Sequence, residues 1–157
     1  MTSVDIDPKS NATYTADVCD WEPPAGESWD CVWASPPCTE FSRALTSRPR
    51  RLEEGLRIAR RCLELIAQLR PKVWFLENPG TGLLPKQSLF EDLPYNLVAY
   101  CKYGFPYKKL TWVANNCTSW QPHPLLLQGV SLHRLEQQST PRVRSTRASE
   151  RTGRLAR

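Results

Sequence analysis

The stretch that decides the fold is residues 52–79, which read LEEGLRIARRCLELIAQLRPKVWFLENP. In its first part, apolar residues recur at helical spacing with Arg and Glu between them: Leu52, Leu56, Ala59, Leu63, Ile66 and Leu69. This spacing predicts a helix over Leu52–Leu69, bounded by Pro71. The apolar run Val73–Leu76 predicts a strand that ends at Glu77-Asn78-Pro79-Gly80. A helix that leads into an apolar strand indicates an α/β domain.

Further strands are predicted on both sides of this unit. Residues 80–94 read as a loop with one helical turn near Leu89, and residues 104–109 have the length of a hairpin connection. In chain order, the predicted strands are Thr2–Ile6, Cys31–Ala34, Val73–Leu76, Asn96–Tyr103 and Leu110–Ala114. This order predicts an α/β domain with a largely parallel sheet, and sites in such sheets lie beyond the carboxyl ends of strands.

Composition and charge separate a neutral body from a basic arm. The chain has 157 residues, of which 40% are hydrophobic and 24% charged, as in a globular domain. Residues 1–133 carry 14 Lys and Arg against 14 Asp and Glu, so the net charge of +5 comes from the seven Arg and two Glu of residues 134–157. We expect a core over residues 1–120, and a remnant or linker with a basic, disordered tail over residues 121–157. The arm either contacts nucleic acid or only keeps the chain soluble.

The sequence offers no sign of a membrane or a secretory route. No apolar run approaches the ~20 residues that span a bilayer, and the first residues lack a secretory signal. We therefore expect a cytoplasmic protein, or a nuclear one in a eukaryotic or viral setting, with no membrane partner. The six cysteines form no CxxC pair, so reduced thiols are expected. Cys31, Cys62 and Cys101 are predicted to lie in the core.

Cys38 differs from the other cysteines because it follows a predicted strand and two prolines. A thiol on such a stiff turn is presented outward and loses little entropy on reaching a target, which suits a nucleophile. Glu77 ends the apolar strand Val73–Leu76, where a carboxylate is partly desolvated and could hold a proton near neutral pH. Each residue also has an ordinary reading, as a free cysteine after a turn and as a surface glutamate.

At these residues the chain resembles the DNA cytosine-5 methyltransferases, in the style of the small phage and virus enzymes. Residues 29–42 (WDCVWASPPCTEFS) resemble the family's Pro-Cys loop, and residues 75–79 (FLENP) resemble its Glu-Asn-Val/Pro motif. Residues 103–109 (YGFPYKK) are similar to the motif VIII lead-in. Residues 4–7 (VDID) and 16–18 (ADV) resemble the two cofactor motifs upstream, and all of these occur in the family's order.

The resemblance implies a Rossmann-like sheet that uses S-adenosylmethionine as cofactor and double-stranded DNA with a flipped cytosine as substrate. It makes Cys38 the nucleophile on C6, Glu77 the partner of the N3/N4 edge, and Lys109 the counterpart of the first motif VIII arginine. The cofactor-binding residues that it implies are Asp5, Ile6, Asp17, Val18 and Pro36. No metal site is expected.

The chain also departs from the family pattern. The Phe-x-Gly-x-Gly turn of motif I, which holds the methionine part of the cofactor, has no counterpart, and the chain begins at what looks like the second strand. Tyr107, Lys109 and Thr111 replace Gln, Arg and Arg, and Lys lacks the two-pronged guanidinium. Residues 121–157 are also too short and too polar for the family's target-recognition region and final helix motif. Together these gaps predict a chain truncated at both ends, and a complementing chain that supplies motif I.

Several alternatives stay open. A thymidylate-synthase-like enzyme would need His where Thr39 stands, and an amino-methyltransferase would need an aromatic residue where Cys38 stands. A non-catalytic or split fragment that binds DNA or a partner is the alternative from another class. Cys117, His123 and His133 are weak candidates for zinc ligands. Arg57, Arg60 and Arg61 are expected to form a solvated helix face, whereas four loop arginines after Cys38 are phosphate-contact candidates: Arg43, Arg48, Arg50 and Arg51.

Overall fold

The computed structural model describes residues 1–125, and these residues (Met1–Leu125) form one compact unit. The basic arm of residues 134–157 and His133 lie outside the described residues, so the predictions made for them stay predictions. No helix within residues 1–125 is both long enough and apolar enough to cross a membrane.

The long helix α1 spans Leu52–Leu69, as its apolar spacing predicts. It ends at Arg70, whose left-handed backbone (φ 47°) lets its N–H donate to the Ile66 carbonyl at 3.1 Å. The fully buried stripe is Gly55, Ala59, Cys62, Leu65 and Ile66, so it is turned slightly from the predicted one. Gly55 is needed for close packing, because a Cβ there would stand 3.1 Å from the Phe41 ring.

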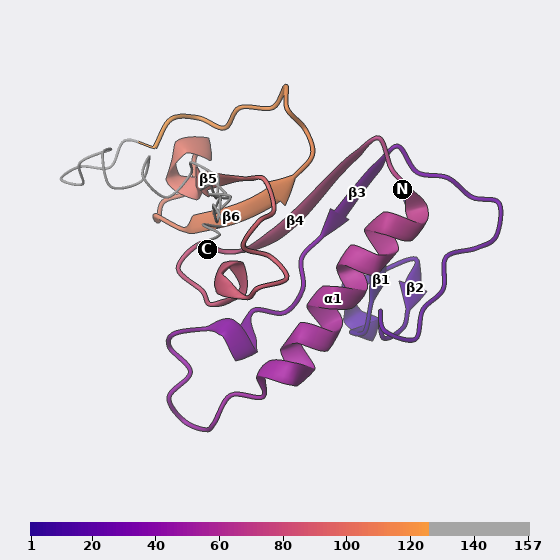
Figure 1. The fold of residues 1–157 in the computed structure, drawn as a ribbon, viewed down its shortest axis with the longest axis horizontal. Helices are drawn as coiled ribbons and strands as arrows, with labels where there is room; N and C mark the ends of the chain where they lie inside the picture. Colours follow the sequence, from indigo (N-terminus) through magenta and orange to yellow (C-terminus); the bar gives the residue numbers. More distant parts are fainter. Residues whose placement is uncertain (126–157) are drawn as a thin grey trace, which may run out of the picture. The chain divides into compact units, whose positions relative to one another are not determined.

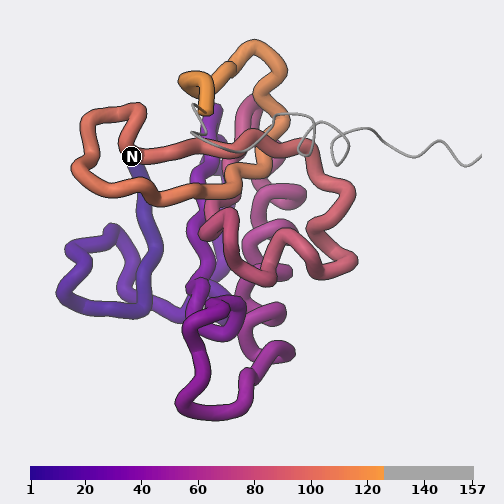
Figure 2. The backbone as a smooth tube through the Cα atoms, turned by 90° about the vertical axis from the view of Figure 1, so that its left-hand side faces the viewer, coloured from indigo at the N-terminus to yellow at the C-terminus, as the bar shows by residue number. Residues whose placement is uncertain are grey.

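The strands form two sheets rather than one (Figure 1). β1 (Val4–Asp5) and β2 (Tyr14–Thr15) pair in parallel, and Figure 2 shows this N-terminal part apart from the larger sheet. The larger sheet has the order β3-β4-β6-β5. Its strands are β3 (Cys31–Ala34), β4 (Val73–Pro79), β5 (Tyr95–Ala99) and β6 (Leu110–Asn115).

The larger sheet is mixed, which corrects the expectation of a largely parallel one. Only β3 and β4 run in parallel, joined through α1, while β6 lies antiparallel to both β4 and β5. The physical reason is the connection after β4. A parallel return needs a crossover that is usually a helix, and residues 80–94 supply only the short 3-10 helix η3 (Leu84–Lys86). The predicted hairpin pairing of β5 with β6 is confirmed.

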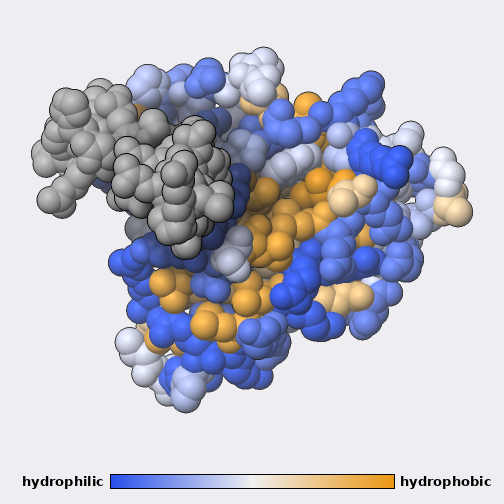
Figure 3. All heavy atoms as spheres, in the orientation of Figure 1, coloured by the Kyte–Doolittle hydropathy of each residue, from blue (hydrophilic) through white to orange (hydrophobic). Residues whose placement is uncertain are grey.

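α1 packs on one face of the larger sheet and makes the core there. Leu76 of β4, Trp112 of β6 and Ala59 of α1 belong to one buried cluster with Phe41 and Phe90. Figure 3 shows apolar side chains gathered along α1 and the strands beside it. The opposite face carries Trp33, 59% exposed, and Glu77. Strand alternation puts these two on the same face, because Trp33 pairs with Phe75, two residues before Glu77.

Two of the three cysteines predicted to lie in the core are exposed. Cys62 is buried, as expected, but Cys31 lies on the side of β3 away from α1. Cys101 is not in a strand, because β5 ends at Ala99 and the 3-10 helix η4 (Tyr100–Tyr103) follows. The other short helices are η1 (Pro8–Ser10) and η2 (Thr39–Phe41).

Candidate active site

Cys38 follows the end of β3 on a turn made by Ser35, Pro36 and Pro37. Pro36 is buried, whereas Cys38 is exposed. The Cys38 carbonyl accepts a hydrogen bond from the Phe41 N–H at 3.0 Å, which starts helix η2. Phe41 itself is fully buried and anchors the end of the turn. The backbone of the turn is thus fixed while the thiol stays open to solvent.

Asn78 ties this turn to the neighbouring strand. Its Nδ2 donates to the Pro36 carbonyl at 2.9 Å, and the residue is only 1% exposed. Its Oδ1 is buried without a hydrogen-bond partner among the described residues. Asn78 directly follows Glu77, so one buried amide joins the segment that carries the thiol to the segment that carries the carboxylate.

Glu40 holds the loop that follows Cys38. Its carboxylate accepts both terminal nitrogens of Arg48, one of them at 3.0 Å, and the Arg51 backbone N–H at 2.7 Å. The hydrogen bond from Arg48, and then that from Arg51, lower the pKa of Glu40 to about 2. The whole residue is 8% exposed, so this ion pair is partly shielded from water.

Three of the four predicted phosphate-contact arginines therefore already have partners. Arg48 binds Glu40, Arg50 donates to the Ser42 carbonyl at 2.9 Å, and Arg51 pairs with Glu54 at 3.1 Å. Arg43 is exposed and has no hydrogen bond or ion pair within residues 1–125. Arg48 thus shapes the loop, and Arg43 is the arginine left for an outside anion.

Glu77 and Lys109 form an ion pair near the carboxyl end of β4. The Lys109 Nζ lies 3.5 Å from Glu77 Oε1, and the Glu77 side chain is only 13% exposed. The same ammonium stands 4.8 Å from the centre of the Tyr100 ring. Burial by itself lowers the pKa of Lys109, but the charges of Glu77 and Tyr100 outweigh it, so this pKa is raised. Two of the predicted catalytic residues are therefore in contact.

An aromatic pocket of about 270 Å³ surrounds Glu77. Its other lining residues are Trp33, Val98, Tyr100, Tyr103, Phe105, Val113 and Trp120. The sequence analysis did not single out these aromatic side chains. The signal that could have found them is strand alternation, which puts Trp33 on the face of Glu77, together with the aromatic run Tyr100–Tyr107 between two strands. The pocket offers flat apolar walls and one carboxylate, which suits a planar ring with hydrogen-bond donors.

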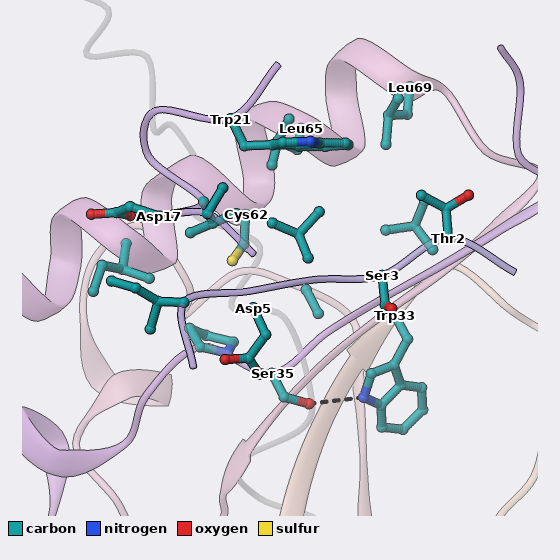
Figure 4. Close-up of a pocket in the computed structure, with 18 of the residues that line it drawn as sticks. Thr2, Ser3, Asp5, Asp17, Trp21, Trp33, Ser35, Cys62, Leu65 and Leu69 are labelled. Atoms are coloured by element: carbon teal, nitrogen blue, oxygen red, sulfur yellow. Dashed lines mark hydrogen bonds between the residues drawn. The ribbon is translucent and has the colours of Figure 1, made fainter. Parts of the chain in front are cut away.

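The predicted cofactor residues line a second, larger cavity of about 700 Å³ (Figure 4). All five belong to its wall: Asp5, Ile6, Asp17, Val18 and Pro36. They come from β1, from the segment after β2 and from the turn before Cys38, so the fold gathers residues that lie far apart in the chain. Cys62, Leu65 and Leu69 of α1 also line this cavity. Burial raises the pKa of the Cys62 thiol to about 11, so that thiol is unreactive.

The two carboxylates of this cavity differ in what they bind. Asp17 Oδ1 accepts the Cys19 N–H at 2.9 Å, and its Oδ2 pairs with Arg57 at 3.3 Å. The Cys19 N–H, followed by Arg57, holds the pKa of Asp17 below its usual range. Within residues 1–125, the Asp5 carboxylate accepts only the Asp7 N–H, at 2.8 Å, and the residue is exposed. Asp5 is therefore the freer acceptor.

Of the three helix arginines expected to form a solvated face, Arg57 and Arg60 are exposed and only Arg61 departs from the expectation. Arg57 pairs with Asp17, and Arg61, whose side chain is 15% exposed, donates to the Trp21 carbonyl at 2.8 Å and to Glu22 at 2.6 Å. Among the described residues no group of three potential ligands could hold a metal ion.

A comparison with known proteins finds a relative at the level of sequence. The chain is 35% identical over 118 residues to a "Probable DNA (cytosine-5)-methyltransferase" of Frog virus 3 (isolate Goorha). The match covers 65% of this chain and 54% of the relative, so the chain spans about half the length of that protein. No family model matches the chain. No solved structure matches it either.

Proposed function

We propose that this chain carries the catalytic face of a DNA cytosine-5 methyltransferase. The carrying observation is the bond between Asn78 and Pro36, which places an exposed thiol and a shielded carboxylate at the ends of neighbouring parallel strands. Glu77 lines the aromatic pocket, and Pro36 and Pro37, just before Cys38, line the larger cavity with its two carboxylates. Cys38 itself lines neither. The similarity to the frog virus protein supports the same reading.

Cys38 would add its sulfur to C6 of a cytosine, which makes C5 nucleophilic. Glu77 would accept from the exocyclic amine and share a proton with N3, which disperses the charge that builds up on the ring. Once C5 carries the methyl group, its proton passes to solvent and the thiolate leaves C6. Because base edges inside a duplex are out of reach, the cytosine would have to be flipped out of the helix first.

The larger cavity suits the nucleoside end of S-adenosylmethionine. Asp5 would accept the ribose hydroxyls, Asp17 would contact the adenine amine, and Ile6 and Val18 would supply apolar contact, since all four line the cavity. When bound, this cofactor supplies the methyl group that C5 takes up and leaves as a neutral thioether. No Lys or Arg lines the cavity, and the sequence's single Gly-x-Gly, Gly80-Thr81-Gly82, follows β4 and lines neither cavity. Within the described residues, the cavity thus offers the methionine carboxylate hydroxyl groups, from Thr2, Ser3 and Ser35, but no cationic side chain.

A second candidate is a chain that binds DNA or a partner without turnover of its own. The observation in its favour is that both Asp17 oxygens already have partners within the chain. In this reading Cys38 and Glu77 stay in place, but the cofactor is held only when another polypeptide completes the cavity.

The decisive experiment is trapping on a DNA duplex that contains 5-fluorocytosine, with S-adenosylmethionine added. Fluorine at C5 cannot leave as a proton does, so the thiol stays bonded to C6. We expect a denaturation-resistant protein–DNA adduct from the natural chain and none from C38S. The proposed enzyme activity would be contradicted if no adduct forms with this chain alone and none forms when the rest of the relative is added as a second chain.

A further inference from the structure

β1 has one edge that pairs with nothing in residues 1–125. The Ser3 and Asp5 carbonyls accept from Tyr14 and Ala16 of the β2 segment, at 2.9 and 3.0 Å. Because backbone groups alternate in direction along a strand, Val4 and Ile6 turn their N–H and C=O groups to the opposite edge. No hydrogen bond from those groups is present within the described chain.

β3 has an unpaired edge of the same kind. The Val73 N–H donates to the Asp30 carbonyl at 3.0 Å, so Asp30 and Val32 face β4. Cys31 and Trp33 therefore present their backbone groups away from β4. β3 is also the last strand of its sheet on that side. Unpaired edges of this kind are templates for another strand.

The two unpaired edges border the same space. The 700 Å³ cavity is lined by residues 1–6 on one side, by residues 31–37 on another and by α1. Figure 4 shows Ser3 and Asp5 at β1, Trp33 of β3 with Ser35 just after it, and Cys62 and Leu65 on the helix α1. Val4, Val32 and Leu65 make this space apolar between two rows of hydrogen-bonding groups. In the part of the cavity between Val4 and Val32, that combination matches a β-strand.

The faces of the strands indicate the same kind of occupant. Parallel pairs such as β1-β2 and β3-β4 belong to sheets that are normally covered on both faces. Here α1 covers one face, while Trp33 on the other is 59% exposed. A chain segment that enters as a strand and then crosses that face would bury it.

We propose that the slot between β1 and β3, defined by Val4, Ile6, Cys31 and Trp33, binds a strand from a second polypeptide. The strand is apolar, contains no proline, and bonds to both edges, which joins the two sheets into one. The relative supplies a source for such a segment, because nearly half of its length has no counterpart in this chain. The inference deepens the proposed function, and it rests on that function for the choice of probe.

The probe is the sequence of the frog virus relative outside the aligned region, expressed as separate polypeptides and added to the full 157-residue chain. The first measurement is the alkylation rate of Cys31, read by mass spectrometry. Cys31 lines the slot and is exposed, whereas Cys101 is exposed and lines neither cavity, so it is the internal control. At a probe concentration about 100 times its Kd, we expect Cys31 to be labelled at least about tenfold more slowly and Cys101 to be unchanged.

The second measurement compares C31P with C31A for binding of the probe. Proline removes the N–H that faces the slot but leaves the β3–β4 hydrogen bonds, because those use Asp30 and Val32. We expect C31P to bind the probe about tenfold more weakly than C31A, because both variants lose the thiol and only the proline also loses the N–H. If C31P fails to fold, the protection of Cys31 in the natural chain decides the matter.

Equal labelling of Cys31 with and without the probe overturns the proposal. The proposal is also overturned if Cys31 is already protected when no probe is present. In that case residues 126–157 or a second copy of the chain would fill the slot. None of these measurements uses DNA or S-adenosylmethionine. If Cys31 is protected but no DNA adduct is trapped, the methyltransferase proposal fails and the partner-strand proposal stands. If an adduct is trapped but Cys31 is not protected, the partner-strand proposal fails and the methyltransferase proposal stands.

Discussion

Single buried side chains position the candidate catalytic groups, and Asn78 is the clearest of them. Its amide joins the Pro36 carbonyl to the strand that carries Glu77. Sequence resemblance marks Asn78 as part of a motif, but only the structure shows what its amide binds.

Replacing Asn78 should therefore loosen the turn before Cys38. We expect N78A to lower the free energy of unfolding by about 1–3 kcal/mol, because the Pro36 carbonyl loses its buried donor. Denaturant unfolding measures this change. N96A is the matched control: Asn96 is half-buried on β5 without a side-chain hydrogen bond among the described residues, so a change within about 0.5 kcal/mol is expected. Equal losses in both variants would contradict the role of Asn78.

Glu77 gives a prediction about rate. Under the proposed function, E77Q should slow adduct formation on the 5-fluorocytosine duplex by about 10²–10³-fold, since the amide cannot share a proton with N3. The control is E91Q, at an exposed glutamate of the loop before β5, which should react at the natural rate. A natural rate in E77Q would remove Glu77 from the mechanism.

At the scale of elements, arginines fasten segments to one another. Arg61 reaches from α1 to the chain segment after β2, where it binds a backbone carbonyl and Glu22. The Glu40–Arg48 pair does the same for the loop between Cys38 and α1. Both contacts join parts that carry candidate site residues, so they bear on the cavity and on the nucleophile.

Removing the Arg61 contact should cost stability. We expect R61A to lower the free energy of unfolding by about 1–3 kcal/mol, because the Trp21 carbonyl loses a charged donor. R60A, the exposed neighbour on the same helix, should change it by less than about 0.5 kcal/mol. Thermal or denaturant unfolding distinguishes the two variants, and matching curves would show that Arg61 fastens nothing.

The Glu40 contact should make stability depend on acid. The pKa of Glu40 is about 2 in the folded chain against an ordinary 4.5, so folding favours its ionised form. Its contribution is therefore complete above pH 4.5 and is lost as the pH falls toward 2. We expect the melting temperature of the natural chain to fall over this range more steeply than that of E40Q. Parallel profiles of the two proteins would refute the assignment.

At the scale of the whole molecule, charge is divided between a neutral body and the arm of residues 134–157. Under the proposed function, deleting the arm should weaken DNA binding and flatten its salt dependence. Because the arm has seven arginines, its deletion should reduce the steepness of the plot of log K against log salt concentration by up to about 6. Binding titrations at several salt concentrations measure this slope. An unchanged slope would mean that the arm only keeps the chain soluble.

Local sequence patterns predicted the features that depend only on residues close together in the chain. The bounds of α1 follow from helical spacing and from Pro71, and the exposure of Cys38 follows from the two prolines before it. The exposure of Cys31 could not be read in this way. Its strand looks apolar on both faces, and only the absence of a cover on one face leaves that thiol open.

The sequence by itself determined the helix and the strand that follows it. Both depend on periodicity and on proline breaks, which act over a few residues. The candidate site residues stay a prediction, made from the family resemblance and from the stiff turn before Cys38. Only the tertiary structure decided that β6 lies between β4 and β5, that Lys109 meets Glu77 across 32 positions, and that five cofactor candidates share one cavity. The physical reason is that such contacts are selected by the packing of distant segments, to which no local pattern refers.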